Sequence, residues 1–195
     1  MAYPQGSRTQ GNTVEPLGYT RLDMSDYLSE LNIRQAISSD LPALEWDGEY
    51  THFRLLYRDI FQSAQHGEAL LWVAELPDLG IIGQLFVQLN SSRKELADGF
   101  QRAYIYGFRI KFDFRGFGLG SYMLNFVETD LVKRGFRITV LNVARDNPEA
   151  RLLYERQGYH IVAAEPGQWS YLDEKGRRCW INEPAWRMEK VIDMN

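Results

Sequence analysis

Cysteine is almost absent from this chain of 195 residues, and its scarcity excludes several kinds of protein. The single Cys179 cannot form an internal disulfide or a multi-cysteine zinc site. A chain without disulfides suits a reducing compartment, so we expect a cytoplasmic protein. No window approaches the roughly 20 apolar residues that a membrane helix needs, and the polar N-terminus lacks the apolar run of a signal peptide. We therefore expect no membrane partner.

An excess of positive charge is also missing. The chain has 22 Lys and Arg against 26 Asp and Glu, a net charge of -4, whereas general nucleic-acid binding needs a basic face. The three histidines, His52, His66 and His160, are scattered without the spacing of metal ligands. We therefore predict neither a nucleic-acid partner nor a metal site.

The remaining composition is that of an ordinary globular domain. Hydrophobic residues make up 45% of the chain and charged residues 25%, both close to the globular average. The length fits one domain. The first part of the chain is polar and rich in Gly, Ser, Thr, Asn, Gln and Pro, which predicts a flexible N-terminal arm over residues 1–28 and a single domain over residues 29–195.

Apolar periodicity predicts a mixed α/β fold. Alternating or continuous apolar runs predict strands, and these lie at residues 31–36, 68–75, 81–89, 102–112, 137–143, 159–164 and 185–192, with a hairpin over 169–173 and 177–181. Helical spacing and capping residues predict a short helix after Ser38 and longer ones over 49–64, 119–134 and from Asn147 to Gly158. The strand, helix and strand in the middle predict a right-handed parallel crossover. The other strand pairs should be antiparallel, with the strand over 185–192 closing the sheet and helices on its faces.

The strand over 102–112 is unusually aromatic. Tyr104, Tyr106, Phe108, Ile110 and Phe112 recur at every second position, which predicts that they share one face. A glycine interrupts the strand between the second and third of them, and such a glycine often marks a bulge or a close backbone approach.

A glycine-rich segment, Arg115-Gly116-Phe117-Gly118-Leu119-Gly120-Ser121, lies between this strand and the next helix. Glycines remove side chains where backbone N–H groups must converge, and a helix start adds unpaired donors and a partial positive charge. Together these features predict an anion site, although a plain glycine-rich turn is the alternative. The Walker pattern is excluded because no lysine precedes Ser121, and the glycine spacing differs from the Rossmann pattern.

The pattern Arg-x-x-Gly-x-Gly from Arg115 to Gly120 resembles the coenzyme A pyrophosphate motif of the GNAT superfamily, the acetyl-CoA-dependent N-acetyltransferases. A second stretch, from Asn147 through Leu153-Tyr154 to Gly158-Tyr159, resembles the family's asparagine, Leu-Tyr and Gly-aromatic signature. One predicted helix and one strand separate the two motifs, as the family requires. The resemblance covers the chain from residue 31 to residue 192.

The resemblance implies a GNAT fold, with a mostly antiparallel mixed sheet, a central parallel strand pair and helices on both faces. It implies acetyl-CoA as co-substrate and no metal. The residues it assigns to the pyrophosphate are Arg115, Gly116, Phe117, Gly118, Leu119, Gly120 and Ser121. It places the pantetheine arm along Phe108, Arg109 and Ile110 like an added strand, with a backbone N–H near Ile110 polarising the thioester carbonyl. Asn147 would bind the pantetheine, cap its helix, or do both.

The resemblance also implies that Tyr154 is the catalytic residue and protonates the departing thiolate. A phenol has a reference pKa of about 10 and a thiol of about 8.5, so the phenol stays protonated and can donate. A core tyrosine at helical spacing is the alternative. Some family members carry a glutamate as general base where this chain has Asn142, which cannot accept a proton. No replacement base is assigned, although Tyr104, Tyr106, Glu45, Asp47 and Glu49 could act through water.

These implications predict direct transfer of an acetyl group from acetyl-CoA to a primary amine within a ternary complex. The acceptor would be a small molecule or a peptide, and Trp169 and Tyr171 lie where the family shapes its acceptor pocket. The family often dimerises, so a homodimer is also implied. The alternative is a non-catalytic coenzyme A sensor or interaction module on the same fold, which Asn142 keeps open.

Overall fold

The computed structural model describes residues 30–193, so the predicted arm over 1–28 lies outside the described residues. Seven strands form the main sheet, in the order β1-β2-β3-β4-β5-β9-β6. In chain order they are β1 (Asn32–Gln35), β2 (Ala69–Leu76), β3 (Gly80–Gln88), β4 (Arg102–Ile110), β5 (Ile138–Ala144), β6 (His160–Glu165) and β9 (Ala185–Val191). Only β4 and β5 pair in parallel; the other neighbours in this sheet are antiparallel. The predicted mixed sheet with a central parallel pair is confirmed.

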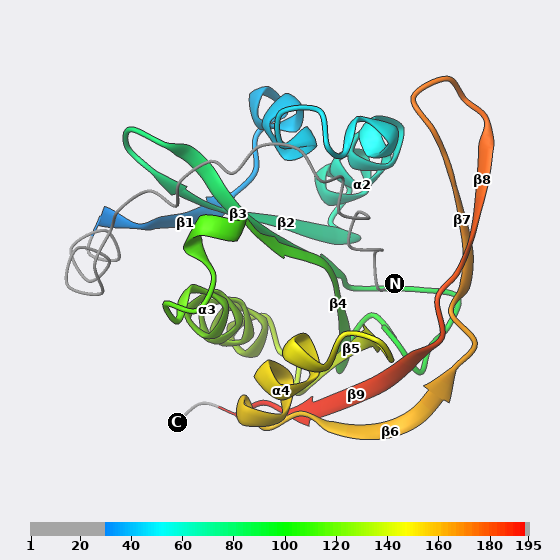
Figure 1. Ribbon diagram of the computed structural model, residues 1–195. Coiled ribbons are helices and arrows are strands. Elements are labelled where there is room, and N and C mark those ends of the chain that lie inside the picture. The colour runs from blue at the N-terminus through cyan, green and yellow to red at the C-terminus, as the bar shows by residue number, and fades with distance from the viewer. Residues whose placement is uncertain (1–29, 194–195) are drawn as a thin grey trace.

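Helices cover both faces of this sheet (Figure 1). One face carries the 3-10 helices η1 (Ser38–Glu45) and η2 (Thr51–Phe53) and the helix α2 (Arg54–Gln65). The other face carries α3 (Leu119–Lys133) and α4 (Pro148–Arg156), and a 3-10 turn η3 (Phe112–Phe114) follows β4. The apolar side chains divide accordingly into two cores, one under α2 and one under α3 and α4.

Local sequence signals set the start of α4. The Asn147 side chain accepts a hydrogen bond from the backbone N–H of Ala150 at 3.0 Å, and Pro148 occupies the first helical position. An asparagine cap followed by proline is favoured because proline lacks an N–H that the helix start would leave unpaired. This part of the prediction is confirmed.

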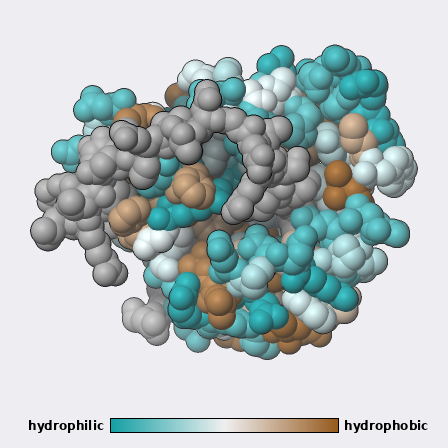
Figure 2. Space-filling model, in the orientation of Figure 1, coloured by the Kyte–Doolittle hydropathy of each residue, from teal (hydrophilic) through white to brown (hydrophobic). Residues whose placement is uncertain are grey.

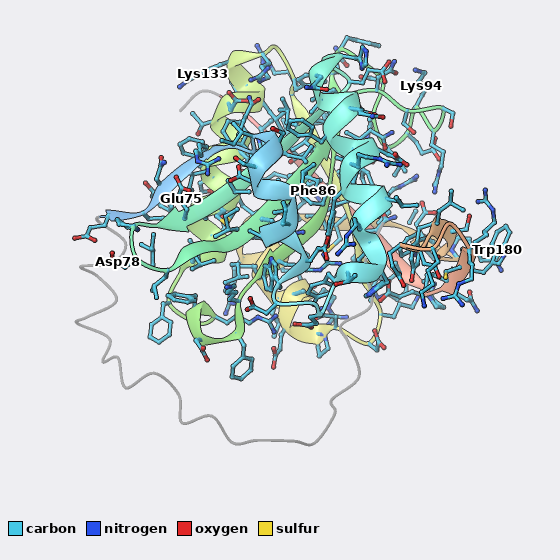
Figure 3. The ribbon with its side chains drawn as sticks, turned by 90° about the horizontal axis from the view of Figure 1, so that it is seen from above. Glu75, Asp78, Phe86, Lys94, Lys133 and Trp180 are labelled. Atoms are coloured by element: carbon cyan, nitrogen blue, oxygen red, sulfur yellow. The ribbon has the colours of Figure 1, made fainter. Side chains whose placement is uncertain are left out.

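The bulge suspected at Gly107 is present in β4. Gly107 has φ +60°, and the register between β3 and β4 shifts beside it. A Cβ built on Gly107 would lie 2.5 Å from the Phe86 ring, which is fully buried at the centre of the sheet below α2 (Figure 3). Both the backbone angle and the missing space therefore require glycine here.

The bulge overturns the expectation that the alternating residues of β4 share one face. Tyr104 and Tyr106 pack in the core under α2, whereas Phe108 and Ile110 pack against the core under α3 and α4. One extra residue in a strand moves every later side chain to the opposite face. Phe112 was also wrongly placed, since it lies in η3 and is 79% exposed.

The C-terminal strand lies elsewhere than predicted. β9 does not close the sheet but lies between β5 and β6, so that β6 forms the edge. The predicted hairpin forms a separate two-stranded ribbon, β7 (Gln168–Leu172) with β8 (Arg178–Asn182). Tyr171 of this ribbon packs edge-on against Phe53 with ring centroids 4.7 Å apart, while Trp180 projects from its outer side (Figure 3).

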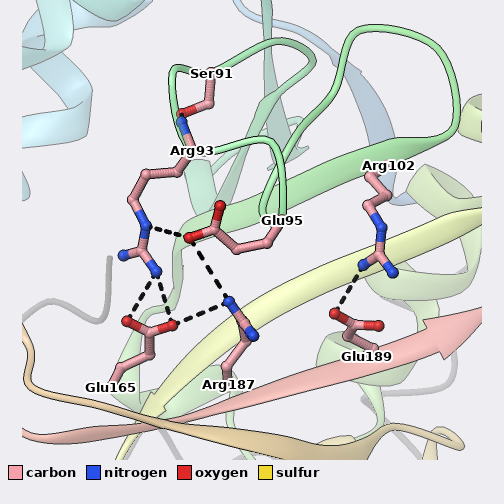
Figure 4. Close-up of polar contacts among 7 residues, drawn as sticks. All are labelled: Ser91, Arg93, Glu95, Arg102, Glu165, Arg187 and Glu189. Atoms are coloured by element: carbon pink, nitrogen blue, oxygen red, sulfur yellow. Dashed lines mark hydrogen bonds and ion pairs between the residues drawn. The ribbon is translucent and has the colours of Figure 1, made fainter.

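Ion pairs hold the loop between β3 and β4 against the far strands (Figure 4). The Arg93 guanidinium donates to both carboxylate oxygens of Glu165 at 2.8 and 2.9 Å, and Arg187 lies 3.3 Å from the same carboxylate. Glu165 is only 6% exposed, so both cations are needed to offset its desolvation.

The surface visible in Figure 2 is largely hydrophilic, with separate apolar patches. Between residues 30 and 193, none of the helices combines the length and the apolar character needed to cross a bilayer. Exposed apolar side chains of this kind are normal on a globular protein when they are scattered.

Candidate active site

The strands β4 and β5 separate toward their carboxyl ends. Their pairing runs only from Arg102–Ile138 to Ile105–Leu141, although β4 continues to Ile110 and β5 to Ala144. Strand edges without a partner offer backbone N–H and C=O groups to another extended chain. The divergence therefore provides a place for an extended ligand beside the last residues of β4.

A cavity of about 740 Å³ opens at this place. Three elements line it: the end of β4, the glycine loop with the start of α3, and α4 with the turn before it. Most of the predicted site residues line this cavity, namely Phe108, Arg109, Ile110, Arg115, Gly116, Gly118, Gly120, Ser121, Asn147 and Tyr154. The two sequence motifs thus meet in one cleft.

Two predicted residues of the glycine loop do not line the cavity. Leu119 is 2% exposed within the core under α3 and α4, and Phe117 packs against the same core. The apolar side chains of the loop anchor it, while the alternating glycines face the cavity. Any contact of these two residues with a ligand would have to come from their backbone.

The glycines of the loop have different roles. Gly116 and Gly118 have φ +83° and +88°, with nothing within 4 Å of a Cβ built on either, so they are needed for backbone conformation. At Gly120 a Cβ would lie 3.2 Å from Leu153, so glycine provides room beside α4. The Arg115 side chain ties the loop to β4 by donating from Nε to the Ile110 carbonyl at 2.9 Å.

Tyr154 reaches the cleft from α4. Its side chain is buried, with 9% of the residue exposed, and burial raises its phenol pKa above the usual value. Its ring meets the Tyr159 ring edge-on at 5.9 Å. The hydroxyl therefore keeps its proton and can act as a donor. Asn147 uses its amide oxygen as the helix cap, which leaves its amide nitrogen as the group that can donate to a ligand.

The Arg109 side chain turns away from the loop and toward α2. It is 7% exposed, donates to the Tyr57 hydroxyl at 2.8 Å, and places its guanidinium 3.9 Å from the centre of the Tyr50 ring. The residue thus lines the cleft and also crosses to the opposite face of the sheet. Contact with aromatic rings stabilises a buried cation at this position.

Several side chains weighed as water-linked bases are unsuitable for that role. Arg54 holds Glu45 at 2.6 Å and keeps the pKa of that carboxyl below its usual value, so Glu45 is a weak base. Burial raises the pKa of Tyr106, which stays protonated near neutral pH. The buried Oδ1 of Asn142 has no hydrogen-bond partner among the described residues, but an amide cannot accept a proton for catalysis.

Sequence reasoning missed several residues that line the cleft. They are Phe114, Asp146, Pro148, Glu149, Ala150, Leu153 and Arg156. Helical spacing would have identified part of this set, because positions three and four residues apart on α4 share the face that carries Tyr154. The turn before α4 offered no comparable signal.

The remaining side chains singled out in the sequence do not line the cleft. The His52 ring lies 4.1 Å from the Phe53 ring, and Trp169 and Tyr171 face the same phenylalanine. Over the described range, no three His, Cys, Asp or Glu side chains come together as metal ligands. The aromatic residues of η2 and β7 thus form one wall on the α2 side of the sheet.

The sequence and the structure of this chain resemble those of known acetyltransferases. The model of the acetyltransferase (GNAT) family matches residues 33–159, while no curated protein matches the chain. Ard1 from Thermoplasma volcanium is similar in structure, with TM-score 0.64 and 18% identity over 85% of this chain and 99% of its own.

Two further structures are similar to the same extent. The ribosomal-protein-S18-alanine N-acetyltransferase from Escherichia coli has TM-score 0.62 and 21% identity, over 85% of this chain and 96% of its own. A variant of the spermidine N-acetyltransferase SpeG from Vibrio cholerae has TM-score 0.62 and 18% identity, over 84% and 94%. At these sequence identities the similar structures show only that the fold is shared. The family model, which matches residues 33–159, shows that this chain belongs to the GNAT family of acyl-CoA-dependent N-acyltransferases.

Proposed function

We propose that the protein transfers an acetyl group directly from acetyl-CoA to a primary amine in a ternary complex. The observation that carries this proposal is the cleft of about 740 Å³ in which the glycine loop, Tyr154 and the end of β4 that has separated from β5 meet. The diphosphate would lie against the backbone from Gly116 to Ser121, at the positive end of α3. The pantetheine arm would lie along Phe108 to Ile110, where β4 no longer pairs with β5.

The chemistry follows from the protonation states of the reacting groups. The amine nitrogen attacks the thioester carbonyl, a C–N bond forms, and the C–S bond then breaks. A backbone N–H near Ile110 would stabilise the oxyanion of the intermediate, and the Tyr154 hydroxyl would give its proton to the departing thiolate. An acceptor that binds as an ammonium loses two protons. The first leaves to solvent before the neutral amine attacks. The second leaves the nitrogen after the C–N bond has formed and replaces the phenol proton that went to the sulfur.

Two observations favour a particular class of acceptor. The net charge of -4 favours a cationic acceptor. Structurally similar proteins carry names that refer to spermidine and to an alanine of ribosomal protein S18. We propose an amine of a small molecule or a peptide, entering on the α2 side where Trp169 and Tyr171 form part of the wall. The homodimer and the cytoplasmic location stay predictions.

An amine panel with acetyl-CoA tests this function. Spermidine, a peptide with N-terminal alanine, a lysine peptide and free amino acids would be assayed for release of the coenzyme thiol. Thermal unfolding with acetyl-CoA runs beside it, since ligand at 100 times its Kd should stabilise the protein by about 2.7 kcal/mol. Turnover with any amine supports the proposal. Stabilisation by acetyl-CoA without any turnover favours the coenzyme A sensor. If acetyl-CoA produces neither stabilisation nor turnover, both the transferase and the sensor are overturned.

A further inference from the structure

Glu183 lies in the short turn between β8 and β9 and is fixed there by backbone contacts. Its N–H donates to the Gly167 carbonyl at 3.1 Å, and the next carbonyl, that of Pro184, accepts from the Arg145 N–H at 3.0 Å. Gly167 approaches so closely that a Cβ built on it would lie 1.6 Å from the Glu183 carbonyl oxygen. These contacts place Glu183 beside the turn that joins β5 to α4.

Within residues 30–193, the Glu183 carboxylate lacks the ion pairs that hold other shielded carboxylates of the domain. Its Oε2 is buried and has no hydrogen-bond partner within residues 30–193. Glu165, by contrast, is held by the guanidinium groups of Arg93 and Arg187 (Figure 4). Burial raises the pKa of Glu183, and the negative charge of Asp146 raises it further. A lone pair that is shielded from water and unused is typical of a functional carboxylate.

Glu183 adjoins the cleft through the turn before α4. Asp146 of this turn lines the cleft and directly follows Arg145, whose N–H donates to the carbonyl of the residue after Glu183. Asn142 and Arg187 are cross-strand partners on the adjoining part of β5 and β9, and the buried Oδ1 and Nε of this pair also lack partners in the described part of the chain. Unsatisfied polar atoms therefore gather along the β5–β9 pair, next to the end of β5 that no longer pairs with β4.

We propose that Glu183 is the general base of the reaction and takes a proton from the acceptor ammonium. This inference rests on the proposed acetyl transfer. The ammonium gives one proton to the Glu183 carboxylate, the freed lone pair forms the C–N bond, and the carboxyl group returns its proton to solvent after the thiol leaves. A general base contributes typically about 10²–10⁴-fold, most where the amine is otherwise almost fully protonated. Glu183 thus supplies the function that Asn142 cannot.

The test compares Glu183→Gln with the wild-type protein, using spermidine and the alanyl peptide as acceptors. The amide keeps the size of the side chain and removes its basicity. At pH 7 we expect kcat/KM for the best acceptor to fall by about 10²-fold, with unchanged affinity for acetyl-CoA. The deficit should shrink as the pH approaches the pKa of the amine, because solvent then supplies the neutral nucleophile. Glu155→Gln, an exposed carboxylate on α4, serves as the matched control and should behave like the wild type.

Asp146→Asn adds a readout that a structural role would not produce. Removing the neighbouring negative charge lowers the pKa of Glu183, so the acidic limb of the kcat/KM profile should move to lower pH. The assignment of Glu183 as the base would be overturned if Glu183→Gln had the wild-type pH profile of kcat/KM. It would also be overturned if the loss of kcat/KM in this variant were the same at every pH. If the wild-type protein itself acetylates no amine, the proposed function fails and the assignment falls with it.

Discussion

Two neighbouring tyrosines allow the same chemical change to be tested for opposite effects. The rings of Tyr154 and Tyr159 meet edge-on at 5.9 Å, and both side chains are buried. The Tyr159 hydroxyl donates to Glu128 at 2.7 Å, whereas no hydrogen bond joins the Tyr154 hydroxyl to the described residues, and Tyr154 lines the cleft. Replacing each by phenylalanine removes one oxygen atom.

The expected magnitudes separate the two variants. Tyr154→Phe should lower kcat by about 10²–10⁴-fold, the usual contribution of a general acid, and leave the free energy of unfolding nearly unchanged. Tyr159→Phe should leave kcat near the wild-type value but cost about 1.5–3 kcal/mol of stability, because it removes a hydrogen bond to a charged group. For a protein of this size each kcal/mol lowers Tm by roughly 2–4 °C.

Thiol release at saturating acetyl-CoA and amine measures the first effect, and thermal unfolding measures the second. The pH profile adds a check of sign. An acid is lost as the pH rises through its pKa, and burial raises the pKa of Tyr154, so this phenol should cause no fall of wild-type kcat below about pH 10. Wild-type kcat in Tyr154→Phe would refute its assigned role, and so would an equal loss in a stable Tyr159→Phe protein.

Three further changes test the geometry. Gly167→Ala should unfold at a clearly lower temperature than Gly176→Ala, because both glycines have positive φ but only the first lacks space for a Cβ; the left-handed conformation alone costs about 1–2 kcal/mol. A Cβ at Gly118 would meet no atom within 4 Å, but alanine disfavours the backbone angle φ +88° that this position has. The resulting strain of about 1–2 kcal/mol acts on the loop that would bind the diphosphate. Calorimetric titration of Gly118→Ala should therefore show acetyl-CoA binding about 5–30-fold more weakly. The hydrogen bonds of Arg34 lower the pKa of Asp40 in the folded protein. The ionised Asp40 carboxylate therefore stabilises the fold above the pKa of the unfolded carboxyl, and this stabilisation is lost as the pH falls through the folded pKa. Asp40→Asn should accordingly lose less Tm than the wild-type protein between pH 5 and pH 3.

Much of the cleft could be predicted because its determinants are local. The glycine loop needs positive φ at Gly116 and Gly118, and the Asn147-Pro148 pair starts a helix wherever it is placed before suitable residues. The bulge was foreseen for the same reason, since Gly107 can adopt a backbone angle that other residues avoid. Such preferences act over a few residues and are therefore visible in the chain.

Other features depend on parts of the molecule that are distant in the chain. Periodicity alone placed Phe108 beside Tyr106, and only the pairing of β4 with β3 shows that the bulge sends them to opposite cores. The insertion of β9 between β5 and β6 likewise follows from strand pairing, which the order of the elements leaves open.

Glu183 shows the same division between local and distant causes. In the sequence it is one acidic residue among 26 Asp and Glu, and nothing local distinguishes it. Folding brings it beside Asp146 and shields its Oε2 from water, and no hydrogen bond to Oε2 comes from residues 30–193. Desolvation and charge repulsion are properties of the assembled surroundings. The chain alone therefore predicted where coenzyme A would bind, and the tertiary structure was needed before a base could be proposed.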